Sequence, residues 1–186
     1  SWNVNSVRAR IDNIKSYLLK YKPDILMMQE IKTEDVNFPY DDFSSMDYES
    51  HVFGQKSYNG VAIIARGKLN NVRTDLIKDK LKQSRIISAE IEYKKKKVQL
   101  INIYTPNGNP VDTEKYDYKK NWMDQLIKQL KTLSKKNSNI VWLDLTDSSG
   151  TTSFEVLPYV KKYVKKQFYK DKNEQVPING YPNLFQ

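Results

Sequence analysis

Four polar side chains stand at the ends of predicted apolar strands: Asn3, Glu30, Tyr104 and Asp144. Glu30 is the most informative, because it follows the wholly apolar run 25–28, which is typical of a strand buried on both faces. A carboxylate at the end of such a strand must be paired, hydrated or bound to a metal ion. Any one of the four could simply terminate a strand. Together they favour a site at one edge of the sheets, if the topology brings the strand ends together.

The composition excludes several other kinds of chemistry. The 186 residues contain no cysteine and one histidine. This excludes a disulfide scaffold, a thiolate metal site, a cysteine nucleophile and any cluster of several histidines. The single histidine, His51, falls on a predicted strand near Phe53, where we expect a surface or edge position without a catalytic role. No apolar run approaches the ~20 residues of a membrane span, so we expect no membrane partner.

The net charge allows two interpretations. The chain has 31 Lys and Arg residues against 22 Asp and Glu residues, which gives a formal charge of +9. Lysines that neutralise phosphates release counterions and bind nucleic acid without sequence preference. However, 26 of the basic residues are Lys and only 5 are Arg, and Asn, Ile and Tyr are also abundant. Codon drift in an AT-rich genome produces the same composition, so the charge alone does not establish nucleic-acid binding.

The periodicity of apolar residues predicts an α/β sandwich. Apolar positions at helical spacing predict a helix from Ser6 to Tyr21, stopped by Pro23, and an amphipathic helix at 116–133. Apolar runs and alternation predict strands at 25–28, 48–53, 60–65, 85–93, 98–104 and 139–145. Four lysines at 94–97 predict a hairpin turn, which is either a solvated tip or a nucleic-acid contact. Strands interleaved with helices in this way are typical of a layered α/β domain.

Several motifs occur in one register along the chain. They are WNVNSVRAR at 2–10, PDI at 23–25, QEIK at 29–32, FP at 38–39, GQKSYNGVA at 54–62, SR at 84–85 and YTPNG at 104–108. Over about residues 1–145 the sequence resembles exonuclease III, the bacterial-type apurinic/apyrimidinic endonuclease of the endonuclease/exonuclease/phosphatase superfamily. The resemblance implies a four-layer αββα sandwich with an incomplete second half. It places the N-terminal part of an exonuclease III-like domain at 1–150 and a divergent basic C-terminal helix or tail at 151–186.

The resemblance also implies a role for each of the four strand-end residues. Glu30 would be the carboxylate that binds Mg²⁺, and Asn3 would support both the metal and the scissile phosphate. Tyr104 would contact the phosphate near the attacking water. Asp144 would activate or orient that water. The chemistry is consistent, because a hard cation prefers oxygen ligands and stabilises charge on phosphate oxygens.

Two sets of residues are candidate nucleic-acid contacts. The first set lies within the shared motifs and consists of Lys56, Arg85 and Asn107. The second set lies in the tail and consists of Lys161, Lys162, Lys165 and Lys166. Interleaved lysines and aromatic residues can neutralise phosphates and stack on bases. We favour a helix over 157–170 whose apolar stripe docks on protein while its lysines face water, and the two interpretations can coexist.

The sequence departs from the family pattern after residue 142. The family writes Gly-Asp-x-Asn at the end of the last predicted strand, where this chain has Leu143, Asp144, Leu145 and Thr146. Thr146 in place of Asn removes an amide donor, so we expect a phosphate or nucleophile contact to be lost. The family's further metal-site aspartate and its closing Ser-Asp-His motif have no counterpart in the sequence. Losing one general acid or base typically costs ~10²–10⁴ in rate.

Two functions follow as hypotheses. The leading one is a catalytically degenerate exonuclease III-like domain, serving as a structural or nucleic-acid-binding subunit of a ribonucleoprotein such as a mitochondrial ribosome. It would lie in the mitochondrial matrix with RNA or DNA and other proteins as partners, and without a cofactor unless an intact site keeps Mg²⁺. The alternative is an active Mg²⁺-dependent AP endonuclease and 3′–5′ exodeoxyribonuclease of DNA repair, seen as a partial chain, in the bacterial cytoplasm.

Overall fold

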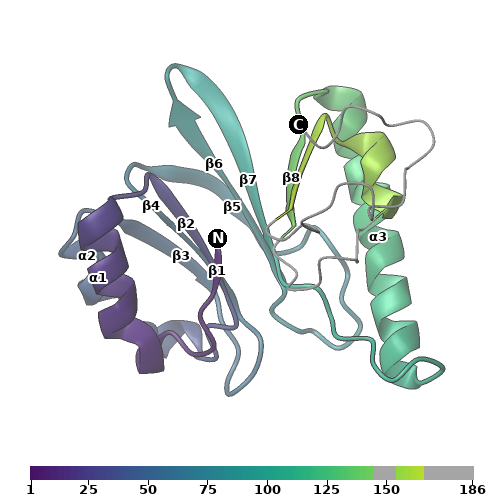
Figure 1. Ribbon diagram of the computed structural model, residues 1–186, viewed down its shortest axis with the longest axis horizontal. Helices are drawn as coiled ribbons and strands as arrows, with labels where there is room; N and C mark the ends of the chain where they lie inside the picture. Colours follow the sequence, from purple (N-terminus) through teal and green to yellow (C-terminus); the bar gives the residue numbers. More distant parts are fainter. Residues whose placement is uncertain (145–153, 166–186) are drawn as a thin grey trace, which may run out of the picture. The chain divides into compact units, whose positions relative to one another are not determined.

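The computed structural model describes residues 1–144 and 154–165 (Figure 1). The chain divides into two compact units, Ser1–Met123 and Asp124–Gln186, and each is considered by itself. This division falls within the long helix of the chain, whereas the domain boundary at residue 150 stays a prediction. Among the described residues, none of the helices combines the length and the apolar character needed to cross a membrane.

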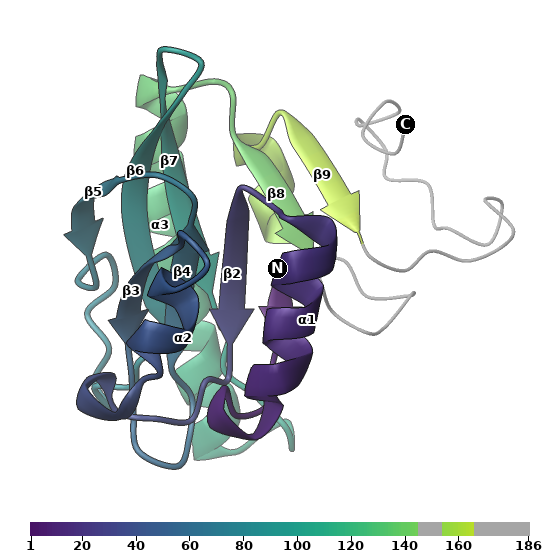
Figure 2. The same ribbon diagram turned by 90° about the vertical axis from the view of Figure 1, so that its left-hand side faces the viewer.

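The first sheet of the Ser1–Met123 unit carries helices on one face. Its strands, in spatial order, are β1 (Trp2–Asn3), β2 (Ile25–Gln29), β4 (Val61–Ala65) and β3 (Glu49–Phe53). β1 is parallel to β2, and the other pairs are antiparallel. The helices are α1 (Ile11–Tyr21) and α2 (Tyr40–Ser44), which Figure 2 shows from the helical side. His51 lies on the edge strand β3 and pairs with Glu49, so the edge position predicted for it is confirmed.

Helix α1 begins later than the periodicity predicts. Asn5 and Ser6 have φ values of 45° and 84°, a left-handed conformation that a right-handed helix cannot include. A 3₁₀ turn, Arg8–Arg10, therefore precedes the α-helix. At the other end Lys22 adopts φ 44° and donates its N–H to Leu18 O at 2.9 Å, which caps the helix before Pro23.

The second sheet consists of β5 (Leu69–Arg73), β6 (Ile86–Tyr93) and β7 (Lys96–Ile103), antiparallel in that order. The predicted lysine turn is shorter than expected, because Lys96 already pairs with Tyr93 in the ladder. Lys94 and Lys95 form the turn with φ values of 49° and 61°, as a two-residue hairpin with left-handed central residues requires. The sequence patterns missed both β5 and the short helix α2.

Strand β4 explains how the layers of this unit stack. Ala62 and Ile64 pack into the core beneath α1 and α2. Val61, Ile63 and Ala65 point to the opposite face, where they pack with residues of the second sheet. Those partners on β6 and β7 are Ile87, Ala89, Ile91 and Leu100. β4 is therefore buried along its whole length, and the unit is layered as helices, sheet and sheet.

A buried amide joins the two sheets. Asn102 on β7 is 1% exposed, and its Nδ2 donates to Met28 O at 2.8 Å and to Ala62 O at 2.9 Å. Its Oδ1 accepts from Gln29 Nε2 at 2.5 Å. These bonds link β7 to both β2 and β4, which fixes the relative position of the strand ends that carry Glu30 and Tyr104.

Gly60, at the entrance to β4, occupies a position that no other residue suits. Its φ is +84°, and a Cβ atom there would lie 2.5 Å from Ile31 Cγ1. We expect Gly60→Ala to lower the free energy of unfolding by about 2–4 kcal/mol, from backbone strain together with the clash. Urea unfolding followed by circular dichroism measures this loss.

Gly67→Ala is the matched control for that prediction. Gly67 also has a positive φ, +125°, but the nearest atom to its added Cβ is Ile91 Cδ1 at 3.8 Å. It should therefore show the backbone strain without the clash. Equal losses for the two variants would contradict a steric role for Ile31.

The second unit contains a parallel pair of strands. α3 (Glu114–Lys136) enters it from the first unit, and it includes the predicted helix 116–133. β8 (Val141–Asp144) pairs with β9 (Lys162–Lys165), and a 3₁₀ helix, Phe154–Tyr159, precedes β9. The tail helix predicted over 157–170 is therefore wrong over its described residues. Pro158 limits the 3₁₀ turn, and Tyr163 is buried while Val164 is exposed, the alternation of a strand.

Candidate functional site

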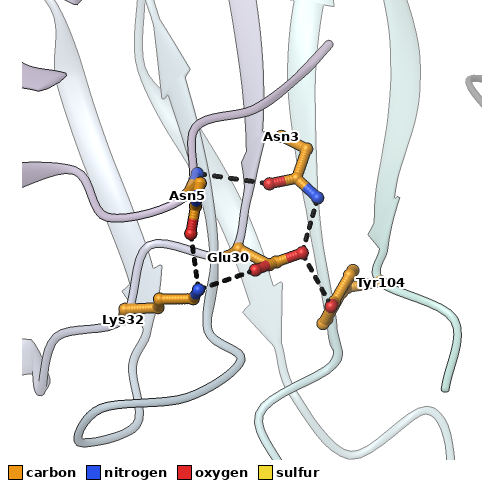
Figure 3. Close-up of polar contacts among 5 residues, drawn as sticks. All are labelled: Asn3, Asn5, Glu30, Lys32 and Tyr104. Atoms are coloured by element: carbon orange, nitrogen blue, oxygen red, sulfur yellow. Dashed lines mark hydrogen bonds and ion pairs between the residues drawn. The ribbon is translucent and has the colours of Figure 1, made fainter. Parts of the chain in front are cut away.

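Glu30 is the centre of a polar cluster in the Ser1–Met123 unit (Figure 3). It directly follows β2, and its side chain is 21% exposed. Glu30 Oε1 accepts hydrogen bonds from Asn3 Nδ2 at 2.7 Å and from the Tyr104 hydroxyl at 2.8 Å. Glu30 Oε2 lies 3.0 Å from the ammonium nitrogen of Lys32. The structure therefore brings together three of the four predicted strand-end residues: the Glu30 carboxylate and its two hydrogen-bond donors, Asn3 and Tyr104.

Asn5 closes a ring of contacts around this carboxylate. Asn3 Oδ1 accepts the backbone N–H of Asn5 at 3.2 Å, and Lys32 Nζ donates to Asn5 Oδ1 at 2.5 Å. Figure 3 shows the resulting circuit through Asn3, Glu30, Lys32 and Asn5. Three partners hold the Glu30 carboxylate, and Asn5 holds both Asn3 and Lys32, so the carboxylate is oriented before any ligand arrives.

The backbone of the cluster contains several residues in the left-handed conformation. Asn5, Ser6, Glu30 and Lys32 all have positive φ values, which lie between 45° and 84°. Such residues store of order 1 kcal/mol each and concentrate at functional sites. Hydrogen bonds fix them: Ser6 N–H donates to Glu30 O at 2.8 Å, and Lys32 N–H donates to Asn59 O at 3.0 Å. The left-handed turns place Glu30 and Lys32 on the same side of the chain.

Tyr104 is positioned from the second sheet. It follows β7, and its N–H donates to Arg85 O at 2.8 Å. The Arg85 Cζ atom lies 4.9 Å from the ring centroid of Tyr104. Burial raises the pKa of Tyr104 to about 12, with a further contribution from Glu30 and an opposing one from Arg85. Its hydroxyl therefore stays protonated at neutral pH and acts as a hydrogen-bond donor.

The charge of Glu30 is stabilised by its neighbours. Burial by itself would raise the pKa of Glu30, but hydrogen bonds from Asn3, Tyr104 and Lys32 together with the Lys32 charge outweigh it, so the pKa is lowered. The group is therefore ionised at neutral pH and available to a cation.

Removing the Lys32 ammonium should raise the pKa of Glu30. A lowered pKa contributes stability at pH values above that of an unfolded glutamate, and this contribution is lost as the pH falls through the folded pKa. In Lys32→Met we expect the Glu30 carboxyl to titrate at higher pH, and the acid side of the stability curve to flatten. Carbon-13 NMR titration of labelled glutamate carboxyls measures the first effect. Lys97→Met, at an exposed site on β7, is the control, and an unchanged Glu30 titration in Lys32→Met would contradict the ion pair.

A basic groove lies beside the cluster and shares Lys32 with it. It has a volume of about 490 Å³. Its lining residues are Ser6, Arg8, Lys32, Thr33, Glu34, Asn37, Lys56 and Ser57. Three of them are cations and one is an anion, and serine, threonine and asparagine supply hydrogen-bonding groups. Such a lining suits phosphate oxygens.

The oxygen donors at the cluster suit a hard cation with few protein ligands. Mg²⁺ commonly binds one or two carboxylates and keeps several waters. Glu30 supplies the carboxylate, and Lys32 shows that a positive charge is accommodated at Glu30 Oε2. Asn3 directs its amide nitrogen to Glu30, while its Oδ1 accepts the N–H of Asn5. In the part of the chain that the structure describes, no group of three or more His, Cys, Asp or Glu residues could hold a metal by itself. The residues therefore fit Mg²⁺ and do not fit a site fully enclosed by protein ligands.

The surroundings of the other predicted residues are described within each unit. Asp144 belongs to the second unit, where it is 5% exposed and accepts a hydrogen bond from the Tyr163 hydroxyl. Asn107 is exposed, and its side chain accepts the N–H of Asn109. Arg85 was predicted as a nucleic-acid contact, but it is 8% exposed and donates to Tyr104 O and to Gln83.

The tail lysines are only partly described. Lys161 and Lys162 are exposed, and Lys161 Nζ donates to Asn139 Oδ1 at 2.8 Å. Lys165 ends β9. Thr146 and Lys166 lie outside the described residues, so the contact expected to be lost at Thr146 stays a prediction.

Sequence reasoning missed two members of the cluster, Asn5 and Lys32. Both belong to the motifs at 2–10 and 29–32, but neither stands at the end of a strand or directly after one. Their signal is spacing: each lies two residues after a predicted site residue, Asn3 and Glu30. In an extended chain residues two apart share a face, and here left-handed residues bring the pairs together.

The geometry agrees with the family comparison. The model of the endonuclease/exonuclease/phosphatase family matches residues 1–143, and the chain belongs to this family. The resemblance to exonuclease III and the expected α/β fold are confirmed by relatives and solved structures of that kind.

Three of these relatives show the extent of the similarity. Exodeoxyribonuclease III of Haemophilus influenzae is 35% identical over 109 residues, which are 58% of this chain and 41% of the relative. An AP endonuclease from Archaeoglobus fulgidus superposes with a TM-score of 0.65 at 38% identity, over 70% of this chain and 49% of that one. The 3′ phosphatase NExo from Neisseria, bound to a product DNA hairpin, gives a TM-score of 0.65 at 31% identity, over 73% and 52%. The chain thus spans about half the length of these proteins.

Proposed function

We propose that the chain carries the metal-binding part of a Mg²⁺-dependent phosphodiesterase site of the exonuclease III type, with DNA as its substrate. The observation that carries this proposal is the Glu30 carboxylate, held by Asn3 and Tyr104 beside a basic groove. The relatives named above are DNA nucleases or a phosphatase bound to DNA by their names, which favours the alternative of an active AP endonuclease and 3′–5′ exonuclease. Nothing in these comparisons supports the leading hypothesis of a degenerate ribosomal subunit.

Each residue of the cluster has a distinct chemical part in this proposal. Glu30 and Asn3 would hold Mg²⁺, which when bound stabilises negative charge on a phosphate oxygen. Tyr104 keeps its proton and donates it in a hydrogen bond to Glu30 Oε1. Asp144 remains the residue predicted to orient the attacking water, on resemblance alone.

The groove supplies the contacts that would orient a nucleic-acid strand. Arg8 and Lys56 are exposed cations at its lining, and Lys32 connects it to Glu30. Contacts of this kind position a phosphate backbone without reading its sequence. They fit a nuclease that acts on many sequences.

The direct test uses the purified 186-residue chain. A duplex with a single abasic-site analogue and a 5′-labelled intact duplex are each incubated with the chain in Mg²⁺ or in EDTA. Mg²⁺-dependent nicking at the abasic analogue or shortening from the 3′ end supports the proposal. Binding of DNA without cleavage in Mg²⁺ would overturn it and return the degenerate hypothesis to first place. The partner proteins and the compartment stay predictions of the sequence.

DNA binding should weaken with salt, and Lys56 should contribute to that dependence. Each phosphate contact adds about 0.7–0.9 to the slope of log affinity against log salt concentration. We expect Lys56→Ala to reduce this slope by about one contact's share and to weaken binding equally for different sequences. Fluorescence anisotropy across a salt series measures it. Lys68→Ala, at an exposed site between β4 and β5, is the control, and equal slopes for wild type and Lys56→Ala would exclude the contact.

A further inference from the structure

A second chain of polar contacts leads away from Tyr104 toward α3. The Tyr118 hydroxyl lies 2.6 Å from Asp79 Oδ2 and 3.2 Å from Gln83 Oε1. The same Gln83 oxygen accepts a hydrogen bond from Arg85 Nε at 2.6 Å. The contacts therefore run from Tyr118 through Gln83 to Arg85, within the Ser1–Met123 unit.

Arg85 is buried to an unusual degree for an arginine. It is 8% exposed, and its guanidinium donates to the side-chain oxygen of Gln83 and, from Nη1 at 3.1 Å, to Tyr104 O. The guanidinium also lies over the Tyr104 ring. A buried guanidinium loses hydration and must be held by several oriented groups, so its position is defined.

Tyr104 is thus held at both of its ends. Its carbonyl oxygen accepts a hydrogen bond from the Arg85 guanidinium, which also lies over the face of its ring. Its hydroxyl donates to Glu30 at 2.8 Å. A shift of Arg85 would move the ring and lengthen the bond to Glu30. Small displacements of a positioned group can cost ~10²-fold in rate.

We infer that Arg85 is a positioning residue for Tyr104, and that Tyr118 and Gln83 hold Arg85 in the orientation this requires. An effect of Arg85 on cleavage rests on the proposed function, whereas the positioning of Tyr104 by Arg85 does not. It gives Arg85 a role different from the nucleic-acid contact that the sequence suggested. It also connects residues before β6 and on α3 to the Glu30 cluster.

A purely packing role for Arg85 would have a different consequence. Packing alone predicts that substitutions along the chain of contacts lower stability and leave the environment of the Tyr104 hydroxyl unchanged. Positioning predicts that the Tyr104 hydroxyl changes its environment even in a variant that stays folded. Tyr118→Phe is suitable, because it removes only the hydroxyl that contacts Asp79 and Gln83.

The experiment follows the Tyr104 ring carbon that carries the hydroxyl, in the full chain labelled with carbon-13 at that position of tyrosine. Loss of one resonance in Tyr104→Phe assigns it. We expect Tyr118→Phe and Arg85→Lys to shift this resonance, and Tyr93→Phe, which removes the hydroxyl of a tyrosine that is 52% exposed, to leave it in place. Circular dichroism checks that each variant is folded. An unchanged Tyr104 resonance in folded Tyr118→Phe and Arg85→Lys would overturn the inference.

Cleavage of the abasic duplex provides a second measurement. Tyr118→Phe should lower kcat/KM about tenfold. Combined with Tyr104→Phe, it should add no further loss, because both changes act through one hydroxyl. Additive losses in the double variant would overturn the inference. If the wild-type chain does not cleave, the proposed function fails, while the resonance still decides the role of Arg85.

Discussion

Glu30→Gln is expected to reduce Mg²⁺-dependent cleavage of abasic duplex by about 10³-fold or more, because it replaces the charged ligand by a neutral amide of the same shape. Asn3, Tyr104 and Lys32 all direct donors at this carboxylate, so the substitution also leaves Lys32 without its counter-ion. The fold should persist, since the side chain lies at the end of β2 and is partly exposed. Single-turnover cleavage across a Mg²⁺ series measures the effect.

Glu92→Gln is the matched control for this prediction. Glu92 is an exposed carboxylate on β6 of the same unit, so the variant has the same change in net charge. It should cleave at the wild-type rate. If Glu30→Gln also kept the wild-type rate and the same Mg²⁺ dependence, Glu30 would not be the metal ligand.

The largest effect on stability is expected at the buried amide between the sheets. Asn102→Ala removes the donor to Met28 O and Ala62 O and the acceptor for Gln29, and it leaves a cavity. Buried polar groups left without partners cost about 1–3 kcal/mol each, so we expect a loss of about 3–5 kcal/mol in the free energy of unfolding. Urea unfolding measures it.

Asn70→Ala is the comparison, because Asn70 is exposed on β5 and makes one long hydrogen bond, 3.5 Å, to Lys68 O. Asn70→Ala should lower the free energy of unfolding by no more than about 0.5 kcal/mol. Similar losses at positions 70 and 102 would show that the amide does not hold the two sheets together.

Much of the first unit could be predicted because its strands are apolar and its loops are polar. The runs at 25–28 and 60–65 gave β2 and β4, and the spacing of Ile14 and Leu18 gave α1. β5 escaped prediction because its sequence, LNNVR, has only two apolar residues and lies at a sheet edge with a register shift. Patterns of burial do not detect a strand that is largely exposed.

The site was predicted in part for a related reason. Asn3, Glu30 and Tyr104 were found because each ends a strand or directly follows one, and the topology of the first unit brings those strand ends together. Asn5 and Lys32 depend on left-handed backbone that the sequence pattern does not specify. Arg85 was predicted to contact nucleic acid because it lies in a shared motif, whereas here an aromatic ring and two oxygens accommodate the guanidinium.

The tail shows the limit of periodicity in a short segment. Val160, Tyr163 and Val164 fit a helical stripe, yet Tyr163 and Val164 lie on opposite faces of β9. Pairing with β8 over four residues supplies the backbone hydrogen bonds that a helix would have supplied locally. A tertiary partner therefore decided the conformation, as it often does for segments rich in β-branched and aromatic residues.

The contact between Lys32 and Glu30 has a consequence for how the protein matures. Many small metal-dependent domains remain unfolded until their ion arrives, because the free energy of metal binding supplies the free energy of folding. Here a side chain of the protein already serves as the counter-ion, and the described part of the cluster contains a single carboxylate. Under the proposed function we therefore expect a newly made chain to fold in a metal-poor environment and to bind Mg²⁺ afterwards. Folding and binding of the cation would then be two separate steps.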